Sequence, residues 1–356
     1  MKPTKILHDS GQSLWLDNIT REMLDQGQIQ RYVDNYDVSG LTSNPSIFDA
    51  AIGSGAYDES IAAHAGDGHS NEEIFFDLAL ADLQRAADLF LPIHERTDGV
   101  DGWVSLEVSP LLAHDSTATI EAATSLHARA ERSNLFIKIP GTLEGLVAIE
   151  ECIFLGVPIN VTLLFDKDQY VEAAGAYLRG IERRVSAGLN PAVGSVASLF
   201  ISRWDVAVAS KVPSELKNQL GLVVGRDTYR AYRELMDSER FQRLANAGAR
   251  TQRLLWASTK TKDPGASDIL YVRGLAAPFT INTIPDSTLE AFFDHGELEG
   301  PLARDGGDCD TLLARFANAG IDTRSLARQL QDEGATSFAD AWAHLIAKID
   351  QQRAPR

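Results

Sequence analysis

Short apolar runs alternate with longer amphipathic segments along most of the chain. Eight of these runs are typical of buried strands, because each is short, rich in branched and aromatic residues and bounded by polar or turn residues. They lie at residues 13–17, 38–44, 103–108, 135–140, 158–165, 193–200, 254–258 and 278–284. Parallel strands need a crossover of about a dozen residues or more between them, usually a helix. The alternation therefore predicts an α/β fold, and eight such units predict a (β/α)8 TIM barrel.

Segments between the strands carry the start and stop signals of helices. Asn71 stands before two glutamates and an apolar series, which predicts the start of a helix there. Two other segments have the capping-box spacing, Asp166 with Gln169 and Ser287 with Glu290. We expect these two helices to end near Gly188 and Gly296. The gaps at 45–102 and 201–253 exceed one crossover and are predicted to hold extra helices.

After Gly300, six apolar side chains recur at helix-like intervals. They are Leu312, Phe316, Leu326, Leu330, Trp342 and Leu345. This pattern predicts a helical extension over 300–356 that packs on the outside of the barrel. No Pro/Ser-rich linker or low-complexity tract divides the sequence, so we expect one domain over 1–356.

Side chains of a barrel strand alternate between the lumen and the helical shell, so parity along each run assigns them to one or the other. The apolar residues assigned to the shell are Leu14, Leu16, Leu41, Val104, Leu106, Val108, Ile159, Val161, Leu163, Leu199, Leu255 and Ala257. The polar residues assigned to the lumen are Asp17, Thr42, Asn44, Ser105, Glu107, Ser109, Asn160, Thr162, Ser198 and Ser258. For a single strand, a polar residue that simply ends the strand in solvent is the more ordinary interpretation. Agreement across six strands favours a site at the carboxyl-terminal mouth, where barrel enzymes place theirs.

One lysine stands out in this pattern. The run at 135–140 is apolar on both faces except for Lys138, which shares the parity of Phe136. Lysine is rarely buried unless it is paired or functional. It could also extend its amine to the barrel mouth, or pair with a carboxylate for structural reasons. The polar residues predicted on neighbouring strands favour a functional lysine.

A lysine among carboxylates, amides and hydroxyls suits imine chemistry. The amine must be neutral to attack a carbonyl, and a free lysine with a pKa of about 10.4 is almost fully protonated at neutral pH. Burial can lower the pKa of a lysine by several units. The iminium that forms is an electron sink, and it stabilises the enamine left when a neighbouring C–C bond breaks. Asp17 and Glu107 are the candidate acid and base groups.

Composition narrows the class of protein. The 356 residues are 44% hydrophobic and 23% charged, a globular mixture that excludes a disordered, collagenous or coiled-coil chain. A net charge of −17 gives a surface that repels nucleic acid and anionic membranes, so we expect neither as a partner. Two cysteines, Cys152 and Cys309, cannot build a disulfide framework, which indicates a cytoplasmic protein. No signal-peptide-like run lies in residues 1–15, and no stretch is long and apolar enough to span a membrane.

The sequence gives little support for a metal site or a nucleotide site. The eight histidines are scattered, and the spacing of His64 and His69 does not align two ligands on one helix. Neither a GxGxxG nor a GxxxxGK[ST] motif occurs. We therefore expect no metal and no cofactor. The sequence carries no signal for the oligomeric state.

Six segments together resemble the transaldolase family in its longer bacterial form, and the resemblance covers nearly the whole chain. They are residues 40–48 (GLTSNPSIF), 105–110 (SLEVSP), 135–142 (LFIKIPGT), 159–165 (INVTLLF), 254–263 (LLWASTKTKD) and 279–285 (FTINTIP). The resemblance implies a class I aldolase-type barrel that acts without a cofactor. Such an enzyme would move a dihydroxyacetone unit from sedoheptulose 7-phosphate to glyceraldehyde 3-phosphate in the pentose phosphate pathway, giving erythrose 4-phosphate and fructose 6-phosphate.

The resemblance also implies roles for matched residues. Lys138 would be the Schiff-base lysine and Asp17 the acid and base for the C4 hydroxyl, while Glu107 with Thr162 would hold a catalytic water. The residues matching contacts to the dihydroxyacetone unit are Thr42, Asn44, Asn160 and Ser198, and those matching phosphate contacts are Arg203 and Ser258.

Lys260 departs from the pattern of shorter family members, which carry arginine two residues after the serine that Ser258 matches. A lysine is a point charge that lacks the bidentate geometry of arginine. Lys260 is accordingly either a phosphate contact or a solvated lysine of the loop 259–262.

Two other functions stay open on the sequence alone. A simple aldolase of the same superfamily would use the same lysine and release the enamine as free dihydroxyacetone. A non-catalytic barrel that binds sugar phosphates would form no covalent adduct. Because the substrates are themselves anions, the acidic surface cannot attract them, and binding must depend on a few local cations such as Arg203 and Lys260.

Overall fold

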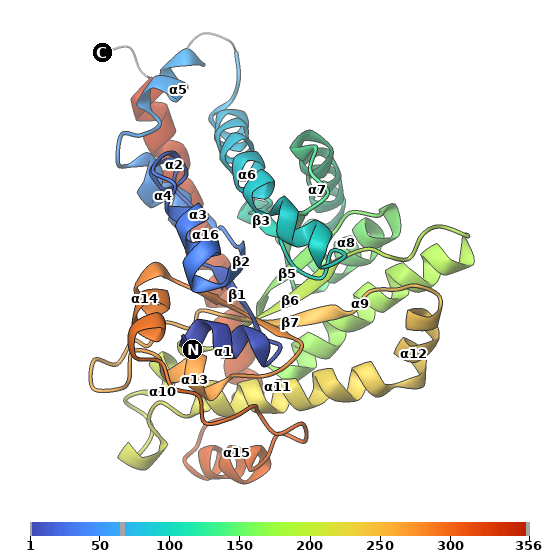
Figure 1. The fold of residues 1–356 in the computed structure, drawn as a ribbon, viewed down its shortest axis with the longest axis vertical. Coiled ribbons are helices and arrows are strands. Elements are labelled where there is room, and N and C mark those ends of the chain that lie inside the picture. The colour runs from blue at the N-terminus through green and yellow to red at the C-terminus, as the bar shows by residue number, and fades with distance from the viewer. Residues whose placement is uncertain (1, 65–67, 354–356) are drawn as a thin grey trace.

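Eight parallel strands form one sheet that curls into a barrel in the computed structural model (Figure 1). The strands are β1 (Ser13–Leu16), β2 (Val38–Leu41), β3 (Val104–Glu107), β4 (Leu135–Pro140), β5 (Ile159–Leu164), β6 (Ser195–Phe200), β7 (Gln252–Ala257) and β8 (Thr280–Ile284). Their order is β2-β1-β8-β7-β6-β5-β4-β3, and a backbone hydrogen bond of 3.0 Å from Leu41 N to Trp103 O links the two edges. The predicted TIM barrel is confirmed. The structure describes residues 2–64 and 68–353.

Helices cover the sheet and occupy the long gaps between strands. Those before β3 are α1 (Pro3–Asp9), α2 (Arg21–Asp25), α3 (Gln28–Tyr36), α4 (Pro45–Ile52), α5 (Asp58–Ala63) and α6 (Asn71–Arg96). Between β3 and β7 lie η1 (Pro110–Leu112), α7 (Ser116–Ala130), α8 (Leu143–Leu155), α9 (Lys167–Ser186), α10 (Ser202–Val208), η2 (Ser214–Leu216), α11 (Leu220–Asp237) and α12 (Glu239–Asn246). After β7 come α13 (Leu270–Gly274), α14 (Asp286–His295), α15 (Cys309–Asn318) and α16 (Thr323–Arg353). The extra helices predicted in the two long gaps are confirmed.

Strand boundaries agree with the predicted runs to within three residues. The prediction for β4 is correct at both ends, whereas β7 begins at Gln252, two residues before the predicted start. The run predicted at 38–44 is too long, because β2 ends at Leu41 and Asn44 already caps α4.

The start of α6 differs by one residue from the predicted one. Ser70, not Asn71, is the N-cap, and a reciprocal capping box joins it to Glu73. At α9, Asp166 caps the helix as predicted by accepting a hydrogen bond from the backbone N–H of Gln169.

The capping box predicted at Ser287 and Glu290 is wrong. Helix α14 begins at Asp286 directly after Pro285, and no side chain caps it. Ser287 therefore already lies in the first turn, where its hydroxyl cannot act as an N-cap.

Two apolar clusters form the core, and the second joins lumen residues of the strands to side chains of α10, α11, α15 and α16. Residues at the lumen include Trp15, Phe136, Val196, Leu255 and Ile281. The shell cluster contains most of the residues assigned to it by parity, among them Leu14, Leu16, Leu41, Val104, Leu106, Val108, Ile159, Val161 and Leu199.

Two shell assignments are wrong, those of Leu255 and Ala257. Leu255 is the register partner of Ser198, which lines the cavity at the mouth, and Ala257 lines the same cavity. Leu163 has a φ of 58°, and the register between β5 and β6 shifts just after Val161, so strict alternation ends before Leu163. Ser258 has a φ of 55°, so the side-chain alternation of β7 does not continue through it. Counting back from Ser258 therefore assigns the side chains of β7 to the wrong faces. A residue in the left-handed backbone conformation breaks the alternation of side chains, and a period-two sequence pattern cannot predict such a residue.

The predicted carboxyl-terminal extension forms α15 and α16, and residues 354–356 of the predicted range lie outside the described residues. Helix α16 packs along α4, α5 and α6, and it runs from beside α5 toward the barrel (Figure 1). It also reaches the barrel mouth, where Gln331 Nε2 donates to Gly141 O at 3.1 Å and to Leu163 O at 2.9 Å. The extension is therefore part of the mouth as well as of the outer layer. We propose that residues 1–356 constitute one domain around this barrel.

Candidate active site

A cavity of about 190 Å³ lies at the carboxyl ends of the strands. Nine of the eleven predicted site residues line it, namely Asp17, Thr42, Asn44, Lys138, Thr162, Ser198, Arg203, Ser258 and Lys260. The other two, Glu107 and Asn160, are buried and hydrogen-bond to members of this set. The nine lining residues come from six strands or the loops that follow them, and Thr283 on β8 also lines the cavity. Glu107 represents β3 through its hydrogen bond to Lys138.

Lys138 is held at the bottom of this cavity. Its side chain is 7% exposed, and Nζ donates to Glu107 Oε2 at 3.0 Å and to Ser43 O at 2.9 Å. Glu107 and Lys138 are register partners on β3 and β4, and Lys138 and Asn160 are partners on β4 and β5, so three lumen side chains stand in one row. The pairing keeps the amine beside a carboxylate that can exchange a proton with it.

Glu107 is buried, and burial raises the pKa of its carboxyl while the nearby Lys138 charge lowers it again in part. Glu107 Oε1 and Thr162 Oγ1 are buried polar atoms without a hydrogen-bond partner among the described residues. Unpaired buried oxygens of this kind are costly unless they bind water or substrate. Both atoms belong to the pair that the resemblance linked to a catalytic water.

Asp17 follows β1 and is fixed by two contacts. Its backbone N–H donates to Ile284 O at 2.8 Å, and its Oδ1 accepts a hydrogen bond from Thr42 Oγ1 at 3.1 Å. Thr42 Oγ1 also lies 2.8 Å from Thr283 Oγ1 on β8. Burial raises the pKa of Asp17, and the Lys138 charge opposes this shift. A carboxylate with a raised pKa at a cavity wall suits proton transfer near neutral pH.

The amide side chains differ in their freedom to bind a ligand. Asn44 Oδ1 accepts the Ile47 N–H at 3.1 Å as the cap of α4, so its Nδ2 group is the part able to donate into the cavity. Asn160 donates to Ser105 Oγ at 3.1 Å and accepts from Ser198 Oγ at 2.7 Å. Asn160 thus orients Ser198, which lines the cavity.

Three cations converge at the outer wall. Arg203 at the start of α10 lies over the rings of Phe200 and Phe338, with centroid distances of 5.1 and 5.9 Å. Burial lowers the pKa of Arg203. Lys260 and Lys262 line the same cavity, and partial burial together with the Lys260 and Arg203 charges lowers the pKa of Lys262. Like charges gathered in this way favour a bound anion.

Ser258 joins the two segments that carry these cations. Its Oγ lies 2.9 Å from Ser202 Oγ, and its carbonyl oxygen accepts the Ser202 N–H at 2.9 Å. The loop after β7 is thereby tied to the start of α10, next to Arg203.

Sequence reasoning did not identify several contributors to this site, and four of them matter most for its chemistry and shape. They are the carbonyl of Ser43, Lys262, Thr283 and Phe338. Lys262 stands at the same alternating spacing as Ser258 and Lys260, which is a signal that could have identified it. Phe338 lies in α16, about 200 residues beyond Lys138, so only the packing of the tail places it here.

Two clusters elsewhere bring potential metal ligands together. Ligand atoms of His64, His69 and Asp77 lie within 4.8 Å of one another, although His64 and His69 do not share a helix. Three further side chains, Asp227, Cys309 and Asp310, form a second cluster, and Arg230 bonds to both of its carboxylates. The expectation of no metal stays a prediction.

The sequence model of the family described as transaldolase/fructose-6-phosphate aldolase matches residues 14–349. The chain belongs to this family. It is 42% identical over 353 residues to Transaldolase 1 of Streptomyces avermitilis, with 96% of this chain and 93% of that protein covered. It is 41% identical to a transaldolase of Thermobifida fusca, covering 99% and 98% of the two chains, and 40% identical to one of Arthrobacter sp. strain FB24, covering 98% and 96%.

Membership of the transaldolase/fructose-6-phosphate aldolase family confirms the resemblance found in the sequence and the prediction of an enzyme that transfers aldehyde or ketone residues. Sugar phosphates fit such a family as substrates. Within residues 2–64 and 68–353, no helix is both long and apolar enough to cross a bilayer.

Proposed function

We propose that this protein is a transaldolase that carries a dihydroxyacetone unit on Lys138 from sedoheptulose 7-phosphate to glyceraldehyde 3-phosphate. The observation that supports this most directly is the buried amine of Lys138, held 3.0 Å from Glu107 at the bottom of a cavity with three cations at its wall. The products would be erythrose 4-phosphate and fructose 6-phosphate.

Imine formation begins when Glu107 takes a proton from the Lys138 ammonium and the free amine attacks the C2 carbonyl of the ketose. The C2 oxygen becomes the hydroxyl of a carbinolamine, and its departure as water needs a proton. A water molecule held by Glu107 Oε1 and Thr162 Oγ1 can carry that proton, because both atoms are buried and have no protein partner among the described residues. The product of this step is an iminium on Lys138.

Cleavage then depends on Asp17. Its carboxylate accepts the proton of the C4 hydroxyl, the C3–C4 bond breaks, and the electron pair moves into the iminium to give an enamine. The aldose leaves, and the enamine attacks the acceptor aldehyde while Asp17 returns the proton to the new hydroxyl. This step regenerates an iminium on Lys138, and addition of water to it breaks the C–N bond and releases the new ketose with the free lysine. Asn44, Thr42 and Ser198 would hold the hydroxyls of the retained unit. The lysine itself supplies the electron sink, so this scheme uses no cofactor.

The phosphate would bind at Arg203, Ser258, Lys260 and Lys262, the cationic part of the cavity wall. The positions of these groups explain how an acidic protein can bind anionic sugars, since the attraction is local and short in range. Lys262 joins the predicted set as a residue that the structure adds.

A transferase and an aldolase differ in the fate of the enamine, and the family description covers both activities. The purified protein should be assayed with fructose 6-phosphate alone and then with erythrose 4-phosphate added. We expect transfer to sedoheptulose 7-phosphate only with the acceptor present. Steady release of dihydroxyacetone without an acceptor would identify an aldolase and overturn the transferase assignment.

A non-catalytic barrel would bind sugar phosphate without forming a covalent bond. Borohydride reduction in the presence of fructose 6-phosphate, followed by peptide mass mapping, should label Lys138. Labelling of other lysines alone, or none at all, would contradict the Schiff-base mechanism.

Lys260→Met and Lys262→Met should each raise the KM for fructose 6-phosphate by roughly 10- to 150-fold, because a charge-assisted hydrogen bond contributes about 1.5–3 kcal/mol. The value of kcat should change little, since the phosphate contact persists from the bound state to the transition state. Steady-state kinetics at two salt concentrations measures this, with exposed Lys211→Met as the control. A normal KM in Lys260→Met would show that Lys260 is a solvated loop lysine.

Gly334→Val should disturb the site through α16. A Cβ at Gly334 would lie 2.9 Å from Leu163 Cδ2 and 3.0 Å from an Nη atom of Arg203, so a larger side chain must displace the arginine or the helix. We expect a KM for fructose 6-phosphate several times higher, while Thr336→Val on the exposed face of α16 should have no such effect. Unchanged kinetics in Gly334→Val would mean that α16 does not position Arg203.

We also infer that the protein acts in the cytoplasm. Cys152 and Cys309 are both buried and free, as expected for a reducing compartment.

A further inference from the structure

A second and larger cavity, of about 730 Å³, opens at the opposite, amino-terminal mouth of the barrel. Segments that lead into β1, β3, β6, β7 and β8 surround it, and none of the eleven predicted site residues lines it. Its volume lies within the range of about 300–1,000 Å³ that small-molecule sites occupy. We refer to it as the lower cavity.

The inner wall of the lower cavity is aromatic. Trp103 and Phe136 stack with ring centroids 4.0 Å apart and an interplanar angle of 19°, and both side chains are buried. Phe136 shares the lumen face of β4 with Lys138, two residues further along the strand. Such a wall favours a flat, apolar ring system as its partner.

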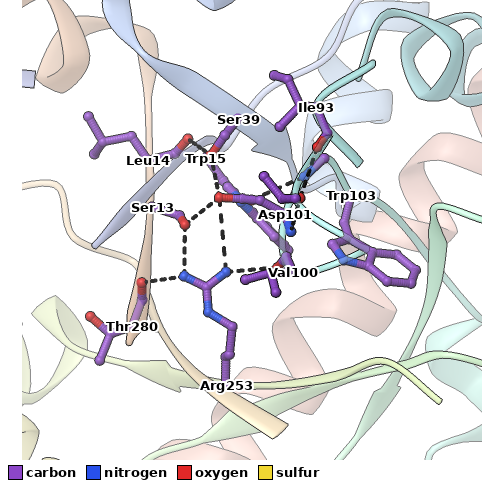
Figure 2. A network of polar contacts seen from close by, with 12 residues as sticks. Ser13, Leu14, Trp15, Ser39, Ile93, Val100, Asp101, Trp103, Arg253 and Thr280 are labelled. Carbon is purple, nitrogen blue, oxygen red and sulfur yellow. Dashed lines mark hydrogen bonds and ion pairs between the residues drawn. The ribbon is translucent and has the colours of Figure 1, made fainter. Parts of the chain in front are cut away.

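A closed polar network forms the side of the lower cavity next to β1 and β2 (Figure 2). Asp101 accepts hydrogen bonds from Ser13 Oγ, from Trp15 Nε1 at 2.6 Å and from Ser39 Oγ at 2.8 Å. Arg253 donates hydrogen bonds to three oxygen atoms, Val100 O at 3.0 Å, Ser13 Oγ at 2.7 Å and Thr280 O at 2.8 Å (Figure 2). Because Asp101 and Arg253 are satisfied within the protein, they make this wall rigid and leave the recognition of charge to another residue.

Phe279 lies at the rim with an unusual backbone. Its φ is 65° and its side chain is 54% exposed, and bulky residues rarely adopt this left-handed conformation. Two hydrogen bonds hold it there, from its own N–H to Gly11 O at 2.8 Å and from Tyr232 Oη to its carbonyl oxygen at 2.9 Å. The fold thus maintains a further aromatic side chain at the cavity edge, partly exposed to solvent.

Arg250 supplies a weakly paired charge at the same rim. Its guanidinium lies 3.6 Å from Asp98, whose side chain is 97% exposed, and so solvent screens this pair strongly. A ligand anion that is partly shielded by the cavity could replace Asp98 as the partner of Arg250.

We propose that the lower cavity binds a planar aromatic molecule with one anionic group, its rings against Trp103, Phe136 and Phe279 and its anion at Arg250. This site is distinct from the sugar-phosphate site and goes beyond the proposed function. The experiment that tests this site measures binding of a probe and not turnover. The proposal can therefore fail while the transaldolase assignment holds.

The probe is 8-anilinonaphthalene-1-sulfonate, a flat aromatic anion that fluoresces in apolar sites, with neutral N-phenyl-1-naphthylamine as its uncharged counterpart. We expect the native protein to bind the anionic probe with one-to-one stoichiometry, and saturating fructose 6-phosphate should not displace it. Arg250→Gln should weaken binding of the anionic probe about tenfold and leave the neutral probe unaffected. Exposed Arg243→Gln, on α12, is the matched control.

A second variant tests the cavity itself. Ala192 lines the lower cavity and is half-buried, so Ala192→Trp should block entry and abolish binding of both probes, with near-ultraviolet circular dichroism checking that the fold is retained. Three results would overturn the proposal: no binding by the native protein, displacement by fructose 6-phosphate, or normal binding in a folded Ala192→Trp. An equal effect of Arg250→Gln and Arg243→Gln would overturn the assignment of the anion to Arg250.

Discussion

Lys138→Ala should lower kcat by at least about 10⁴-fold, the scale on which loss of a nucleophile acts in other covalent enzymes. The residual rate would come from binding and from the remaining polar groups. Lys260 and Lys262 also carry amines, but they lie at the cationic outer wall and not beside Glu107. Borohydride trapping with fructose 6-phosphate should be lost together with activity. Exposed Lys211→Ala is the control for loss of a lysine, and it should keep both properties.

The fold should survive this substitution. Removing the amine leaves Glu107 buried beside no cation, and an unpaired buried charge is normally destabilising by several kcal/mol. Burial already raises the pKa of Glu107, so the carboxyl can take up a proton instead of staying charged. A cooperative thermal transition and an unchanged near-ultraviolet circular dichroism spectrum check this. Retention of more than a few per cent of wild-type kcat in a folded Lys138→Ala would refute the mechanism.

Glu107→Gln should slow imine formation on the order of 10²- to 10³-fold, the range of general acid–base catalysis, with little change in the binding of sugar phosphate. The amide keeps the shape of the side chain and a hydrogen bond to Lys138, but it cannot accept a proton from the ammonium. Rapid-quench trapping of the imine measures the step directly. A higher KM with a normal rate of trapping would mean that Glu107 only binds substrate.

The pH dependence of this step follows from the raised pKa of Glu107. The carboxylate must be ionised to act as a base, so the wild-type trapping rate should fall as pH falls through a range above the ordinary glutamate value. Glu107→Gln should lose this acid limb. Loss of cleavage at low pH can persist in the variant, because the pKa of Asp17 is raised as well.

The stability of the fold should depend on pH in the opposite direction to the trapping rate. Because folding raises the pKa of Glu107, the native state binds the proton more tightly than the unfolded chain, and the free energy of unfolding falls as pH rises between the unfolded and folded pKa values. Denaturant titrations at a series of pH values give the free energy of unfolding of wild type and of Glu107→Gln. Plotted against pH, the two sets of free energies should differ in slope within that range. Parallel curves would mean that Glu107 does not change its proton affinity on folding.

Parity along a strand predicts which face a side chain lies on, and this prediction is correct for Glu107, Lys138 and Asn160. Each was assigned to the lumen from its own strand, because an isolated polar residue opposite an apolar face has few other places to lie in a barrel. Their alignment in one row depends on the register of β3, β4 and β5, which hydrogen bonds between strands determine. No single strand contains that information.

Left-handed backbone interrupts the alternation of side chains at the ends of two strands. Leu163 and Ser258 adopt left-handed backbone conformations at the ends of β5 and β7, so a period-two pattern fails there. The failures lie at the carboxyl ends of strands, where local geometry is shaped by what each loop must place at the mouth.

The sequence by itself determined the strand–helix alternation, the barrel and nine of the eleven candidate site residues, because hydrophobic periodicity and local polarity are properties of short segments. The other two, Arg203 and Lys260, came from the family resemblance. Tertiary structure alone decided which groups meet. It joined Lys138 to the carbonyl of Ser43, added Lys262 and Phe338 to the cavity wall, and carried α16 from the outer layer to the mouth. The reason is physical, since contacts between residues far apart in the chain follow from strand register and helix packing, which no local pattern encodes.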